Sequence, residues 1–103
     1  MVDTTPLTQA VEFFADRLRA APQSRLQRGA AAEALALARQ LARWAQRVEE
    51  PGSEPREMPD AGMFAAADQI LVAAHDVGLV LRTEDEVAEA VRLVEEARQK
   101  AGV

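Results

Sequence analysis

The feature that most constrains the fold is the segment from Ser24 to Val48, where apolar residues recur with the period of an α-helix. Ala, Leu and one Trp fill half of its helical wheel, whereas Arg and Gln fill the other half. The chain holds 22 Ala but only five Gly and five Pro, which favours helix because Ala is the strongest helix former. A half-cylinder of apolar surface is wider than one neighbouring helix can cover. We therefore expect this helix to contact more than one other helix.

Three further amphipathic segments accompany this long helix. We predict four helices, over residues 6–20, 24–49, 61–77 and 84–100. An acidic, Pro- and Gly-containing loop is expected at residues 50–60. Chains of 103 residues form one domain, and four amphipathic helices bury their apolar stripes against one another. The sequence thus predicts an all-α fold, a small four-helix bundle with one long amphipathic second helix, in a single domain over residues 1–103.

Short signals predict where the helices begin. Pro6 suits the first helical turn, which makes Thr5 the expected N-cap of the first helix. A Ser or Thr followed three residues later by Gln or Glu is typical of a capping box, and the chain has two of them: Ser24 with Gln27, and Thr83 with Glu86. These two boxes are expected to open the second and fourth helices.

The third helix and one interior glycine complete these expectations. Asp60 is the expected N-cap of the third helix, and Gly78 occupies the place of a C′ glycine. The broad apolar arc of this helix includes Met63 and Phe64. Gly29 costs about 1 kcal/mol relative to Ala inside a helix, so the long helix is expected to kink or fray there.

Composition and charge exclude several classes of function. The absence of Cys excludes disulfides, thiolate metal sites and thiol nucleophiles. The single histidine, His75, lies at the edge of an apolar arc and has no second His with which to build a bundle metal site. We therefore expect no metal and no cofactor. The net charge of −5 divides unevenly, with +3 over residues 1–48 and −8 over residues 49–103.

The polar face of the long helix is the first candidate binding surface. It presents four arginines that could contact an acidic protein partner: Arg28, Arg39, Arg43 and Arg47. A basic helix is also typical of phosphate contact in nucleic-acid binding. The net negative charge, the single Lys and the absence of aromatic or Asn residues on this face disfavour nucleic acid. It stays the alternative, beside a face that is solvated or paired with the acidic loop.

The apolar face of the same helix is the second candidate surface. Small side chains along one flank would let another helix approach closely, and they predict self-association: Ala31, Leu35, Ala38, Ala42 and Ala45. In a monomer the first, third and fourth helices together could cover this flank. Because those helices are short and poor in large side chains, a second copy of the chain is the expected cover. The expected assembly is a homodimer.

No catalytic constellation is assembled in the sequence, which favours a non-enzymatic helical module for protein–protein interaction. A regulator that binds nucleic acid through the arginine face is the alternative function. A third hypothesis is a small-ligand or enzymatic site in the bundle core, involving His75 or the pair Glu86 and Glu89. No apolar stretch reaches the roughly 20 residues of a membrane span, and no secretory signal is visible. We expect a soluble cytoplasmic protein, and the abundance of Arg over Lys suggests a GC-rich bacterial genome.

Overall fold

Four long helices form the fold, and the computed structural model describes all residues 1–103. Their bounds are α1 Thr5–Ala20, α3 Ala31–Glu49, α4 Ala66–Gly78 and α5 Glu84–Ala101. Three short turns adjoin them: α2 Gln23–Arg25, the π-helical turn η1 Leu26–Ala30 and the 3₁₀ turn η2 Met63–Ala65. The predicted all-α four-helix bundle with a long second helix is confirmed, because α2, η1 and α3 follow one another without a gap. No helix is long and apolar enough to cross a lipid bilayer.

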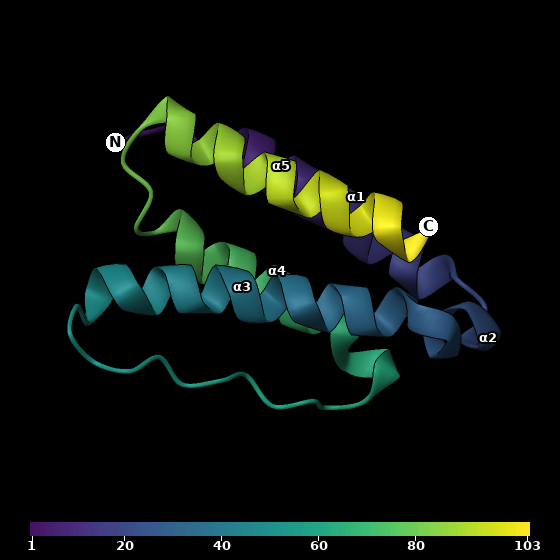
Figure 1. Cartoon of the computed structure of the whole chain (residues 1–103). Helices are drawn as coiled ribbons and strands as arrows, with labels where there is room; N and C mark the ends of the chain where they lie inside the picture. The colour runs from purple at the N-terminus through teal and green to yellow at the C-terminus, as the bar shows by residue number, and fades with distance from the viewer.

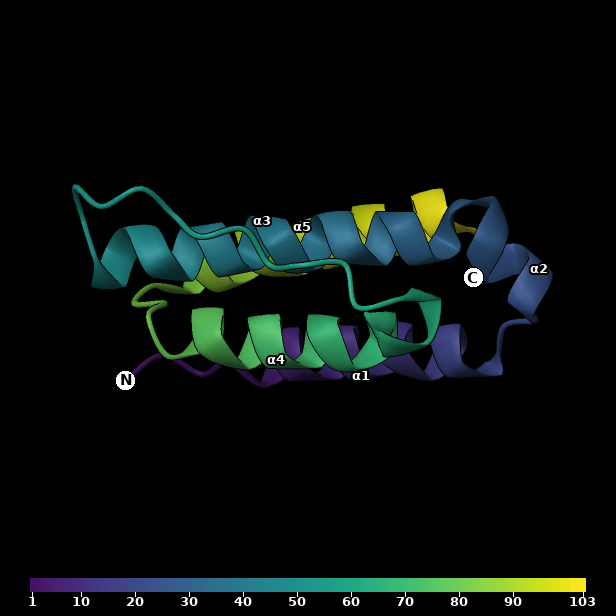
Figure 2. The ribbon, with the colours of Figure 1, turned by 90° about the horizontal axis from the view of Figure 1, so that it is seen from below.

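Two of the three connections between the long helices cross a diagonal of the bundle. Both α1 and α3 pack against α4 and α5, so α1 lies diagonally opposite α3 and α4 lies diagonally opposite α5. In Figure 1, α1 and α5 run in one direction, whereas α3 and α4 run in the other. Because α3 and α4 are parallel neighbours, residues 50–62 must return along the whole bundle. Figure 2 shows this segment, hereafter the crossover, running back beside α3.

The core consists almost entirely of small and branched apolar side chains. All 25 buried residues are hydrophobic, and 13 of them are Ala, so the helices can approach one another closely. The apolar stripe of α1 is buried, with Leu7, Val11, Phe14 and Leu18 in the core. Phe13, which lies off that stripe, is 52% exposed. No polar or charged side chain is buried, so the interior holds no titratable group.

The long second helix bends at the predicted place but begins differently. Gly29 has a φ of 149°, outside the helical region, and interrupts the regular geometry within η1. The expected capping box of Ser24 and Gln27 is wrong. The N-cap is Pro22, whose extended backbone lets the helix begin at Gln23, so Ser24 lies inside the first turn. Its hydroxyl therefore makes no capping hydrogen bond.

The other helix starts show one correct and one shifted prediction. The capping box of α5 is confirmed, since Thr83 Oγ1 accepts from the Glu86 backbone N–H at 3.1 Å and the Glu86 carboxylate accepts from the Thr83 N–H. Thr5 is wrong as an N-cap, because α1 begins one residue earlier than expected and Thr4 takes that position. The Asp3 carboxylate accepts from the Thr5 N–H at 2.9 Å and supplies the missing acceptor.

Both ends of α4 also differ from expectation. The Asp60 carboxylate accepts from the Gly62 N–H at 2.8 Å, and Gly62 is the N-cap of η2, so Asp60 caps a turn of the crossover two residues before the N-cap position. Gly78 is an ordinary helical residue, and the chain leaves α4 through a tight turn in which Val77 accepts from the N–H groups of Val80 and Leu81. Phe64 was expected in the apolar arc, but it lies in η2 and is 73% exposed.

Candidate interaction surfaces

The crossover is fastened to α3 and α4 by side chains that donate to its backbone. Arg39 Nε donates to the Met58 carbonyl at 2.8 Å, and Gln69 of α4 donates to the Pro59 carbonyl at 2.8 Å. The Gln46 amide pairs twice with the backbone of Arg56, accepting from its N–H at 2.7 Å and donating to its carbonyl at 3.0 Å. This segment has no regular structure, so these bonds satisfy its peptide groups.

The four predicted arginines divide into one that makes an ion pair and three that make none, of which Arg28 and Arg47 are exposed and Arg43 is half-buried. Arg39 is only 28% exposed in its side chain and adds an ion pair with Glu57 at 3.4 Å. It therefore belongs to the anchoring of the crossover. Arg28, Arg43 and Arg47 take part in no ion pair. The free part of the arginine face consequently has three members.

The predicted self-association flank faces its own chain. Ala38 and Ala45 are core residues with no side-chain surface to offer a second molecule. Ala31 and Leu35 lie beside Ala66 and Gln69 of α4, lining one shallow groove with them. Ala42 lies under Met58 and Pro59 of the crossover. The close helix contact that the small side chains permit is therefore made with α4 of the same chain.

A different surface, the side of α4 that faces away from the core, carries three of the six large apolar residues that are exposed. Val72 is 56% exposed and Leu79 is 73% exposed, and both lie on the same side of the helix as Phe64. Leu71 is half-buried beside them. Two polar side chains share this strip: Asp68 and His75. We call these six residues the α4 outer face.

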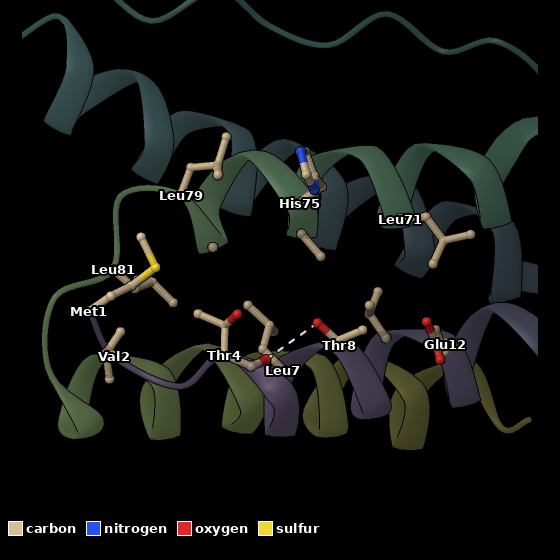
Figure 3. Close-up of a pocket in the computed structure, with 13 residues that line it drawn as sticks. Met1, Val2, Thr4, Leu7, Thr8, Glu12, Leu71, His75, Leu79 and Leu81 are labelled. Carbon is tan, nitrogen blue, oxygen red and sulfur yellow. Dashed lines mark hydrogen bonds between the residues drawn. The ribbon is translucent and has the colours of Figure 1, made fainter.

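A cleft opens at one end of the α4 outer face, between α1 and α4. Figure 3 shows Leu71, His75 and Leu79 on the α4 side of this cleft and Thr4, Thr8 and Glu12 on the opposite side. Met1 and Val2 complete its lining at the N-terminal end, and its volume is about 390 Å³. We call it the terminal cleft. It is mainly apolar, with 8 hydrophobic residues among the 13 that line it.

The titratable side chains of the molecule all lie outside the core. No group of three or more His, Asp or Glu side chains lies close enough to hold a metal ion. Glu86, a candidate for a core ligand site, serves as the acceptor of the α5 capping box. Hydrogen bonding from Arg92 lowers the pKa of Glu89, and hydrogen bonding from Thr5 lowers the pKa of Asp3. Both carboxylates are exposed, so these shifts mark surface pairs.

The sequence contained only part of the signal for the α4 outer face. Val72 and Leu79 fall outside the apolar arc of their helix, which is visible on a helical wheel. The exposure of Phe64 was not foreseeable, because it depends on the 3₁₀ turn that precedes α4. The terminal cleft is lined in part by Met1, Val2 and Thr4, and no periodicity specifies the path of this segment ahead of α1. Comparison of the chain with protein-family models, with curated proteins and with solved structures finds no match.

Proposed function

We propose that this chain is a non-enzymatic helical module for protein–protein interaction, and that it associates with a second copy of itself. The observation that supports this function is the α4 outer face, where large apolar side chains meet solvent on a helix whose opposite side is in the core. Contiguous exposed apolar surface is typical of interaction sites, because monomeric proteins rarely leave such surface uncovered.

The residues that line the terminal cleft and the core support this proposal. The terminal cleft is open and mainly apolar, and its polar side chains (Thr4, Thr8, Glu12 and His75) form no side-chain hydrogen bond with one another, so no nucleophile–base pair is assembled there. The core is free of polar side chains, so a catalytic or cofactor site between the helices has no group to work with. Apolar docking is the chemistry that these surfaces support best.

Sedimentation velocity over about 1 µM to about 1 mM tests the proposal, because a self-associating module shifts from one to two chains within that range. The expected result is a concentration-dependent dimer. A single monomeric species at every concentration, together with no binding of an apolar dye to the native protein, would overturn it.

The alternative function is nucleic-acid binding, or docking of an acidic protein, through the arginine face of α3. The observation that favours it is the absence of any ion pair at Arg28, Arg43 and Arg47. If this face binds phosphates, affinity for duplex DNA falls steeply with salt. A variant with Arg43→Glu and Arg47→Glu would then lose that affinity, whereas Lys100→Glu on α5 would keep it. No binding at about 50 mM salt excludes the nucleic-acid form of this hypothesis.

A further inference from the structure

The α4 outer face has an internal symmetry in its chemistry. Counted from the midpoint between Leu71 and Val72, Phe64 lies as far toward the N-terminus as Leu79 lies toward the C-terminus. Asp68 and His75 are also equidistant from that midpoint. Each position thus has an equivalent at the other end of the helix: large apolar with large apolar, and acidic with basic.

Such a face is complementary to itself when it is turned around. A two-fold axis that lies in the interface, perpendicular to α4 and level with this midpoint, places two α4 helices antiparallel to each other. It brings Phe64 opposite the partner's Leu79 and Asp68 opposite the partner's His75. In a closed dimer the same patch is used by both subunits, so self-complementarity is the geometric requirement for such a contact.

The terminal cleft gives Phe64 a place to be buried. Leu79 forms part of the wall of this cleft, together with Leu71 and Val2. Phe64 itself lines a shallow pocket with Leu18 and Arg19 of α1, which places it on the α1 side of α4, the same side as the cleft. The two-fold rotation places the α1 sides of both subunits on the same side of the interface. The Phe64 ring of each subunit therefore lies over the cleft of the other, as an aromatic anchor over an apolar pocket.

The charges at the centre of the face agree with this arrangement. Arg19 of α1 donates to Asp68 at 2.7 Å, so the carboxylate is already oriented on the outer surface. A carboxylate accepts several hydrogen bonds and retains capacity for a ring N–H from the partner's His75. Asp68 would otherwise face an identical Asp68 in a parallel pairing, where like charges repel.

We propose, building on the self-associating function above, that the dimer forms through the α4 outer face, with the two α4 helices antiparallel. Each Phe64 fills the terminal cleft of the other subunit, and the Asp68–His75 pairs set the register. The occupant of the cleft is thus a second copy of this chain. Because the dimer is two-fold symmetric, the Phe64 anchor, the terminal cleft and the Asp68–His75 pair each occur twice in it.

Cysteine cross-linking tests the geometry, because the natural chain contains no Cys. In the antiparallel dimer the two Val72 positions lie next to the two-fold axis, so Val72→Cys forms a disulfide-linked dimer under mild oxidation. The two Leu79 positions are roughly 22 Å apart along the helix axes. A disulfide spans about 4.4–6.8 Å between Cα atoms, so Leu79→Cys forms no linked dimer. Equal cross-linking of both variants would overturn the proposal.

A matched pair of phenylalanines tests the anchor. Phe64→Glu is expected to weaken dimerisation by at least about 30-fold, since it removes an aromatic anchor from both halves of the interface. Phe13→Glu is the control, because Phe13 is also exposed but lies on the α5 side of α1, beneath Arg98. Circular dichroism reports whether each variant keeps its helices. Equal weakening by both substitutions, or by neither, would contradict the anchor.

These results separate this proposal from the broader one. If the natural chain dimerises but Val72→Cys does not cross-link and Phe64→Glu has no effect, the α4 interface is wrong while self-association stands. If the natural chain is monomeric at every concentration, both proposals fail.

Discussion

Gly29 and Gly78 lie within helical segments but have different backbone conformations. Gly29 has a φ of 149°, which side chains with a Cβ rarely adopt, whereas Gly78 is helical. Gly29→Ala is therefore expected to lower the free energy of unfolding by about 1–3 kcal/mol, although the space around it is open.

Gly78→Ala is the matched substitution and is expected to have the opposite sign. A Cβ at Gly78 would meet Thr4 Cγ2 at 4.0 Å, an ordinary contact. Loss of chain entropy in the unfolded state then stabilises the fold by about 0.4–1 kcal/mol. Urea unfolding of the two variants measures both effects. A stable Gly29→Ala variant would show that the bend in η1 is not needed.

Glu89 makes stability depend on acid pH. Its hydrogen bond from Arg92 lowers its pKa in the folded chain below the usual 4.5. The folded state then binds fewer protons than the unfolded state, so the stabilisation is present above pH 4.5 and is lost as the pH falls through the folded-state pKa. The lowered pKa of Asp3 acts in the same direction.

Glu89→Gln removes this titration. Between neutral pH and about pH 3, we expect the melting temperature of the variant to fall less than that of the natural chain. The difference at neutral pH is small, since the pair is exposed to solvent. Glu33→Gln, at a residue with no ion pair, is the control for loss of a negative charge. Identical acid curves for the natural chain and Glu89→Gln would contradict the linkage.

At the scale of the element, a small number of side-chain hydrogen bonds and one ion pair hold the crossover against α3 and α4. Arg39→Met keeps the length of the side chain but removes the bond to the Met58 carbonyl and the ion pair with Glu57. We expect a loss of about 1 kcal/mol and faster amide exchange over residues 56–62. Hydrogen-exchange mass spectrometry measures the second effect.

The control for this prediction is Arg43→Met, one helical turn further along the same face. Arg43 has no ion pair, so its substitution is expected to change stability by less than about 0.5 kcal/mol. If both variants exchange at the rate of the natural chain, the crossover does not depend on Arg39.

Element type and face were predictable because hydrophobic periodicity repeats over several turns. The buried stripe of α1 and the position of Phe13 follow directly from the helical wheel. Single-residue signals were less informative. The Ser24 and Thr83 boxes have the same form, but only Thr83 stands at an N-cap, because Pro22 moves the start of the other helix. Local motifs compete with their neighbours, and the sequence motif alone does not show which one prevails.

At the scale of the whole molecule, the order of the helices was not predictable. A loop of this length can turn back as a hairpin or run along the bundle, and no local signal in residues 50–60 distinguishes the two paths. The small-residue flank of α3 was predicted to let another helix approach closely. That it approaches α4 of the same chain depends on the parallel placement of α3 and α4. The choice of which helices pack together decides this contact, and hydrophobic periodicity does not specify that choice.

The parallel placement of α3 and α4 sets a minimum length for the crossover. The 19 residues of α3 extend about 28 Å, and the 13 residues of the crossover can span roughly 43 Å. Removal of residues 51–58 leaves about 17 Å of chain, which is too short to join the two helices. We expect this deletion to abolish cooperative thermal unfolding of the monomer.

A shorter deletion is the control. Removing Glu54 and Pro55, which make no hydrogen bond or ion pair, leaves roughly 36 Å and is expected to preserve the fold. Thermal melts followed by circular dichroism distinguish the two variants. A cooperative, monomeric transition in the eight-residue deletion would mean that the parallel arrangement is wrong.

The connection of helices across the diagonals of the bundle also affects the folding rate. Neither α1 with α3 nor α4 with α5 forms a packed hairpin, so the chain lacks the short-range contacts from which most small bundles assemble. Nearly every stabilising surface joins segments from opposite halves of the sequence, which raises the contact order. A chain of this kind is expected to fold more slowly than an up-and-down bundle of equal length and equal stability.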